Sequence, residues 1–149
     1  MFNKTVEHYK KKFKDEYAMI DTGDIENIAS SHGIHNLKVE LEANSAEFKD
    51  FAYDVASFMP GRVSCVAYAC AVASIADKYG VPYKKFVGFC LPKSSSKYDE
   101  NIDAFKKGKE QGKEHPIFAT HVYITIGDNT YEYFNGEYEN IDHIDVVEF

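Results

Sequence analysis

Three residues that are far apart in the sequence have the side chains that thiol chemistry needs. Cys65 follows a break at Pro60-Gly61 and opens a run of small and apolar residues. A sulfur in the first turn of a helix lies near unpaired N–H groups and the positive end of the helix dipole, which favour the thiolate. A thiolate that attacks an acyl carbon also needs a base for its proton and a third group that holds the base. His121 and Asn135 can supply these two roles.

The segments around His121 and Asn135 are rich in β-forming residues and flank Gly-Asp-Asn at 127–129, which predicts a β-hairpin. With a three-residue loop at 127–129, position 121 falls opposite position 135. Paired positions share a face of the sheet, so this register places His121 beside Asn135. A loop of two residues would put them on opposite faces. Asp128 is an alternative third group, but it lies at the far end of the hairpin from His121.

The element that carries Cys65 is predicted to be a buried helix. Nearly every residue of 66–76 is apolar or small, and the first charge comes at Asp77. A helix that is apolar on all sides belongs in the middle of a domain. Gly80 and Pro82 end this helix. The sequence KKFVGFCL at 84–91 then has the β-branched and aromatic content of a short strand.

Apolar residues at steps of three and four predict further helices before Cys65. We expect an opening amphipathic helix, a short helix that ends near Gly33, and a helix introduced by Asn44 and Glu47 as a capping box, covering 2–20, 24–33 and 44–59. His32 and His35 have a spacing that could bind a metal on one helical turn, but Gly33 between them favours a surface loop. No metal site is expected.

Residues 92–119 are polar and rich in lysine, with one predicted helix around 102–109. A long excursion of this kind in a small domain is often a lid or a surface for a protein partner, and a variable insertion is the alternative.

The composition limits the class of protein. The 149 residues are 44% hydrophobic, which fits a single domain, 1–149, with an N-terminal helical part, 1–59, and a core, 60–149. The net charge of -7 argues against nucleic acid as a partner. No apolar run is long enough for a membrane span, and the N-terminus lacks a signal-peptide core, so we expect a cytoplasmic location without membrane contact. Three cysteines without a paired C-x2-C spacing indicate free thiols and no structural zinc.

The stretch GRVSCVAYACAVASIADKYGVPYKKFVGF, residues 61–89, resembles the core motif of the transglutaminase-like superfamily, which has a papain-like cysteine fold. In that motif a nucleophilic cysteine opens a helix that ends in Leu/Tyr-Gly-Ile/Val-Pro, and a short strand ending in Gly-Tyr or Gly-Phe follows. The matching positions are Cys65, Ala69, Gly80, Val81, Pro82, Val87, Gly88 and Phe89. The segments THVYITIG and YEYFNG are similar to the second block of the family, which carries the histidine and the third residue.

The resemblance implies an α+β fold, with a central buried helix packed on an antiparallel sheet of three to five strands and helices N-terminal to it. It makes Cys65 the nucleophile, His121 the general base and Asn135 the residue that orients the base. The backbone N–H of Cys65 would hold part of the oxyanion. The chain departs from the family at Asn135, where aspartate is usual, and at residues 122–123, where a small residue and tryptophan are usual.

The activity implied is thiol-dependent acyl transfer on protein or peptide amides without a cofactor, with a cysteine peptidase or amidase as the first choice. A protein-glutamine transglutaminase or deamidase shares the same acyl-enzyme and is an alternative. A papain-like module that binds proteins without turnover is the alternative from another class, with the tyrosine-rich hairpin or residues 92–119 as its docking surface. The departures at 122, 123 and 135 support that reading.

Overall fold

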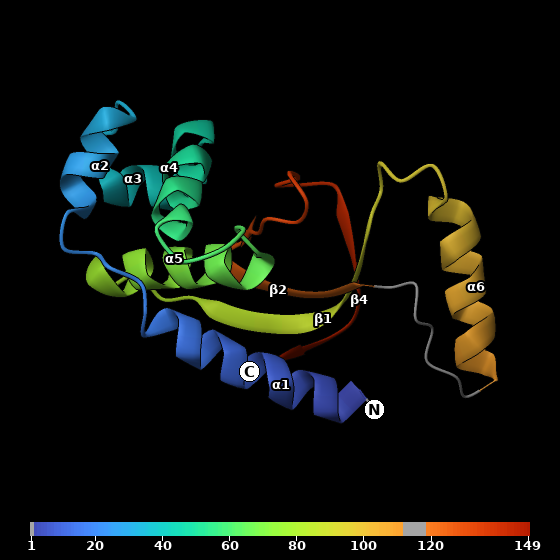
Figure 1. Ribbon diagram of the computed structural model, residues 1–149. Coiled ribbons are helices and arrows are strands. Elements are labelled where there is room, and N and C mark those ends of the chain that lie inside the picture. Colours follow the sequence, from blue (N-terminus) through green and yellow to red (C-terminus); the bar gives the residue numbers. More distant parts are fainter. Residues whose placement is uncertain (1, 112–118) are drawn as a thin grey trace.

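The computed structural model describes residues 2–111 and 119–149, and over these residues it shows six helices and one four-stranded antiparallel sheet (Figure 1). The fold is therefore a mixed helix and sheet fold, as expected for the α+β class. None of the helices in these ranges is both long enough and apolar enough to cross a membrane.

Four helices precede the cysteine segment, and their bounds are α1 Phe2–Tyr17, α2 Ile25–Ser31, α3 Leu37–Ala43 and α4 Ala46–Ser57. The sequence predicted α1, α2 and α4 but not α3. Asn44 was expected to cap the helix after it, and this was wrong, because Asn44 ends α3 in the left-handed conformation. Ser45 caps α4 instead, and its hydroxyl accepts a hydrogen bond from the backbone N–H of Phe48 at 3.1 Å.

The helix α5, Cys65–Lys78, is the central buried helix that the sequence predicted. All of its residues 66–76 are buried, and the helix contacts α1, α4 and the sheet. Five alanines in this stretch let the neighbouring elements approach closely. Gly80 has a positive φ of 66° and turns the chain out of the helix, as expected for a glycine at a helix end.

The sheet has the order β3-β2-β1-β4, with bounds β1 Lys84–Pro92, β2 Ala119–Ile126, β3 Asn129–Tyr131 and β4 Ile141–Glu148. The strand β1 pairs with β2 on one side and β4 on the other. The pairing with β4 shifts between Val87 and Phe89, and there a Cβ on Gly88 would lie 2.7 Å from the Cα of Val146. Only glycine allows this close approach of two backbones. The strand β4 was not predicted.

The β2–β3 hairpin was predicted, but the expected register was wrong. Ile126 pairs with Asn129, so the loop has two residues, Gly127 and Asp128, and not three. The count along the two strands then brings position 134, and not 135, opposite His121. The rings of His121 and Phe134 lie edge to face with their centroids 5.6 Å apart, which agrees with that count.

The helix predicted in the excursion 92–119 is α6, Tyr98–Glu110, and Figure 1 shows it standing apart from the other helices. The Tyr98 hydroxyl donates a hydrogen bond to Asp142 in β4 at 2.5 Å, which ties the start of α6 to the sheet. Residues 112–118 of the predicted excursion lie outside the described residues.

Candidate active site

The structure places Cys65 at the first position of α5, as the sequence predicted. Ser64 precedes it in an extended conformation, and the Ser64 hydroxyl accepts a hydrogen bond from the N–H of Ala67 at 3.1 Å. This cap fixes where the helix begins, and therefore where the sulfur lies. Cys65 is partly exposed, whereas Cys70 and Cys90 are buried. Of the three thiols, Cys65 is therefore the one that a reagent or substrate reaches most directly.

The Cys65 thiol interacts with the imidazole of His121, which lies in β2. Burial alone would raise the pKa of the Cys65 thiol. The nearby imidazole of His121 and its positive charge outweigh this effect, with help from the Val122 backbone N–H, and the thiol pKa is lowered. Burial alone would likewise lower the pKa of His121, but its interactions with Cys65 and Glu132 raise it to about 8. The two groups thus favour the thiolate and imidazolium forms in each other.

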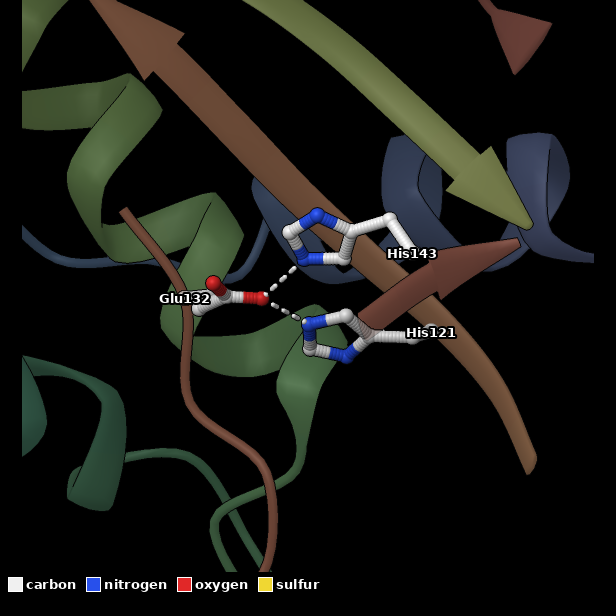
Figure 2. Close-up of side chains that lie close together, drawn as sticks. All are labelled: His121, Glu132 and His143. Atoms are coloured by element: carbon white, nitrogen blue, oxygen red, sulfur yellow. Dashed lines mark hydrogen bonds and ion pairs between the residues drawn. The ribbon is translucent and has the colours of Figure 1, made fainter. Parts of the chain in front are cut away.

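Glu132, which directly follows β3, holds the other side of the imidazole (Figure 2). The distance from His121 Nε2 to Glu132 Oε1 is 2.7 Å, and the two side chains are 1% and 5% exposed. An ionised carboxylate only accepts hydrogen bonds, so Nε2 carries the proton. The neutral ring then has its lone pair on Nδ1, the nitrogen left for the thiol of Cys65.

Nδ1 of His121 makes no well-aligned hydrogen bond within the described part of the chain. This atom is buried and has no hydrogen-bond partner of good geometry among the described residues. The sulfur of Cys65 is nevertheless close enough to change the pKa of both groups. Loose alignment between a catalytic base and its nucleophile is common before substrate binds, and the contact tightens in the complex.

A second histidine, His143 in β4, contacts the same carboxylate oxygen. Its Nε2 lies 2.6 Å from Glu132 Oε1, and its ring is nearly parallel to that of His121, with an angle of 8° and centroids 6.0 Å apart. Figure 2 shows the two rings converging on Glu132. Burial would raise the pKa of the Glu132 carboxyl, but the hydrogen bonds from the two histidines lower it.

Asn135 does not take the role that the sequence gave it. It lies in an exposed turn with a positive φ of 47°, between the bridged residues Phe134 and Glu137. His121 donates its hydrogen bond to Glu132 instead. The correction follows from the hairpin register, because the two-residue loop shifts Asn135 away from His121. Asp128, the other third group considered, lies in that loop.

Packing against the helices fixes the position of Glu132. Its neighbour Tyr131 is fully buried, its ring meets Phe48 of α4 edge to face, and its hydroxyl donates a hydrogen bond to the carbonyl of Leu41. The side chain of Asn44 also donates to the carbonyl of Thr130 at 3.0 Å. The start of the segment that carries Glu132 is therefore held to α3 and α4.

The helix α1 contributes two further groups near the thiol. The positive charge of Lys12 helps to lower the pKa of Cys65. Burial raises the pKa of Tyr9, and the negative charge of Cys65 raises it further, so the Tyr9 hydroxyl stays protonated. Both residues come from a helix that packs against α5. The N-terminal part of the chain therefore takes part in the electrostatics of the site.

The other sequence candidates lie elsewhere. Cys70 and Cys90 are buried, and burial raises the pKa of both thiols, which agrees with an inert packing role. His32 pairs with Asp54 of α4, with 2.6 Å between Nε2 and the carboxylate. This contact is an ordinary surface pair.

Glu132 and His143 were not predicted as site residues from the sequence. Glu132 alternates with Tyr131 and Tyr133 in a β-rich segment, a pattern that favours a solvent-facing carboxylate, so no local signal indicated its burial. His143 lies in β4, which was not predicted. Their contact depends on a sheet order that a single sequence does not reveal.

Comparisons with known proteins found no relative of this chain. No protein-family model, no curated protein and no solved structure matches the chain.

Proposed function

We propose that the protein is a thiol-dependent acyl-transfer enzyme with a papain-like active site, in which Cys65 is the nucleophile, His121 the general base and Glu132 the residue that orients the base. The observation that carries the proposal is the buried pair of His121 and Glu132, 2.7 Å apart, near a thiol at the first position of a helix. The likeness of residues 61–89 to the transglutaminase-like core motif supports it.

The reaction follows from the proton positions. Nδ1 of His121 takes the thiol proton while the sulfur of Cys65 attacks the carbonyl carbon of an amide. The backbone N–H of Cys65 lies at the free end of α5 and stabilises the oxyanion. The imidazolium then gives its proton to the leaving amine as the C–N bond breaks, and an acyl-thioester remains. Water attacks the thioester, which releases a carboxylic acid and restores the thiol.

Glu132 stabilises the imidazolium that forms in this cycle. A carboxylate does this more strongly than the neutral amide of Asn135 would, because opposite charges favour the charged form of the ring. The departure from the family at position 135 supported an inactive binding module, because it left the base without a carboxylate partner. Glu132 supplies such a partner, so this support is weaker.

The first test is the rate of alkylation of Cys65 by iodoacetamide against pH, with EDTA present and the modified residue identified by mass spectrometry. We expect selective reaction at Cys65, with an apparent pKa below the ~8.5 of a free thiol. His121→Ala should abolish this advantage. His32→Ala is the matched control, because it also removes an imidazole that is paired with a carboxylate. If Cys65 reacts like an ordinary thiol and His121→Ala changes nothing, the proposal fails.

A second readout separates hydrolysis from transfer. The ester 4-nitrophenyl acetate should acetylate Cys65, and mass spectrometry then follows the acetyl-enzyme over time. A cysteine peptidase or amidase, our first choice, loses the acetyl group to water at a rate that a small primary amine does not change. Faster loss with a matching amide product would favour a transglutaminase. An acetyl group that never leaves would favour the binding module.

A further inference from the structure

His143 has no task in the reaction proposed above. One hydrogen bond to Glu132 is enough to hold His121, yet two buried or partly buried imidazoles point their Nε2 atoms at the same carboxylate oxygen (Figure 2). The three donor atoms of His121, Glu132 and His143 lie within 4.8 Å of one another. Convergence of two imidazoles and a carboxylate on one point is the arrangement of a metal site.

We propose that His121, Glu132 and His143 bind a divalent transition-metal ion, zinc in the first place, through the two Nε2 atoms and a carboxylate oxygen. Two histidines and a glutamate are one of the ligand sets that proteins use for zinc, with water in the fourth position. Imidazole and carboxylate donors favour zinc and its neighbours over magnesium or calcium, which prefer oxygen ligands alone.

The three donor atoms lie within 4.8 Å of one another and must rearrange to surround an ion. Donor atoms around a tetrahedral zinc at 2.0–2.1 Å lie about 3.3 Å apart. The two N···O distances, 2.7 Å and 2.6 Å, are those of hydrogen bonds and must lengthen by about 0.6–0.7 Å when the ion replaces the protons. His143 is 23% exposed, which makes it the side from which an ion can enter.

Packing around the ligands supports the site. Tyr123 stacks on His143 with centroids 4.2 Å apart and lies parallel to His121 as well, so one aromatic side chain contacts both rings. Tyr123 is buried and rests in turn against Phe86 of β1. The ligand rings are thus held by packing, which preorganises the site and reduces the conformational entropy lost on binding.

Metal binding and the proposed reaction exclude each other, a consequence that rests on the proposed function. A neutral imidazole that binds an ion through Nε2 carries its proton on Nδ1. That nitrogen can then no longer accept the proton of Cys65. The metal-bound form would therefore be a resting form of the enzyme that a chelator releases.

Zinc binding to the metal-free protein, measured by isothermal titration calorimetry, tests the site. We expect one ion for each chain. His143→Gln should weaken binding by at least about tenfold, because the amide keeps a donor for Glu132 but is a poor metal ligand. His32→Gln, the matched control, should bind zinc like the wild type. Equal affinity of His143→Gln and wild type would overturn the proposal.

Cys65→Ser distinguishes this site from a zinc ion held by the thiol. We expect zinc binding to persist in Cys65→Ser, and loss of binding there would overturn the proposal. The spectrum of the cobalt-loaded wild type adds a check without any variant, because a thiolate-to-cobalt charge-transfer band would also contradict it. Since Cys65→Ser has no nucleophile, these results do not depend on whether the enzyme proposal holds.

Discussion

Glu132 is a buried carboxylate that receives hydrogen bonds from two imidazoles. Its ionised state fixes the proton of His121 on Nε2, and its charge raises the pKa of the ring. Both effects act on the thiol of Cys65 through His121, so in the proposed reaction Glu132 is a positioning residue and does not itself touch the reacting atoms.

Glu132→Gln tests this role against that of Asn135. The amide is the same size, but it lacks the charge that favours the imidazolium, so the pKa of His121 should fall and that of Cys65 should rise. We expect alkylation of Cys65 at pH 7 to slow by about tenfold, which corresponds to one pKa unit. Asn135→Gly suits the positive φ at this position and should react like the wild type. Slower alkylation of Cys65 in Asn135→Gly than in Glu132→Gln would contradict the assignment of Glu132 as the third residue.

The places of Cys65 at a helix start and of His121 in a strand could be expected from the sequence, because helix caps and β-rich segments are local signals. The identity of the third residue could not. A hairpin loop of two or three residues fits the Gly-Asp-Asn sequence about equally well, and one residue of difference decides which side chains share a face. The packing of Tyr131 against α3 and α4 contributes to the observed register, and no local pattern reports that packing.

Among the elements, α5 sets the position of the nucleophile through its N-cap. The serines Ser64 and Ser45 cap α5 and α4 in the same way, each accepting a hydrogen bond from an N–H three residues later at 3.1 Å. Only the α5 cap adjoins the site. Variants of the two serines therefore separate the contribution of a cap to the stability of the protein from its effect on the reactivity of Cys65.

Ser64→Ala and Ser45→Ala should each lower the free energy of unfolding by about 0.5–2 kcal/mol, measured by urea denaturation. Ser64→Ala should in addition slow Cys65 alkylation by about twofold to fivefold, because a frayed first turn loses the 0.3–1 kcal/mol that a helix terminus gives a nearby anion. Ser45→Ala should leave the alkylation rate unchanged. Equal effects of both variants on that rate would show that α5 does not act through its terminus.

The elements differ in how far the sequence revealed them. The buried helix α5 and the strand β1 follow from hydrophobic pattern and turn residues. The strand β4 does not, because its register against β1 shifts and Asp145 has a positive φ of 50°, which breaks the alternation that marks a strand. The helix α3 has only seven residues, too few for a clear period.

At the scale of the whole molecule, the site links stability to pH. Burial and the two histidines leave Glu132 with a pKa below its ordinary value of 4.5. The folded protein therefore binds fewer protons than the unfolded chain in this range, and Glu132 stabilises it above about pH 4.5. That stabilisation is lost as the pH falls through the pKa of the folded state.

We expect Glu132→Gln to lower the free energy of unfolding by about 1–3 kcal/mol near pH 6, because a charged hydrogen-bond acceptor is lost. The difference from wild type should shrink below pH 4.5. Urea denaturation between pH 3 and 6, with EDTA present, measures both. Asp54→Asn removes the half-exposed carboxylate beside His32 and should cost about 1 kcal/mol or less. A difference for Glu132→Gln that does not vary with pH would contradict the linkage.

The α+β class and the central helix could be predicted because they rest on composition and periodicity. The way in which α1, the cysteine helix and β4 meet could not, since it depends on long-range packing such as that of Phe13 on Phe149. Long-range packing of this kind is why Lys12 and His143 lie in the region of the site. Local sequence patterns did not connect either residue with Cys65.

The three thiols differ in burial, so the rates at which they are labelled report on the opening of different parts of the fold. Cys65 is partly exposed, whereas Cys70 in α5 and Cys90 in β1 are buried, so we expect Cys65 to react from the native state and the other two only when those elements open. The labelling rates of the two buried thiols therefore report how often the central helix and the central strand separate from their neighbours. If both are labelled at one rate, helix and sheet open as a single cooperative unit.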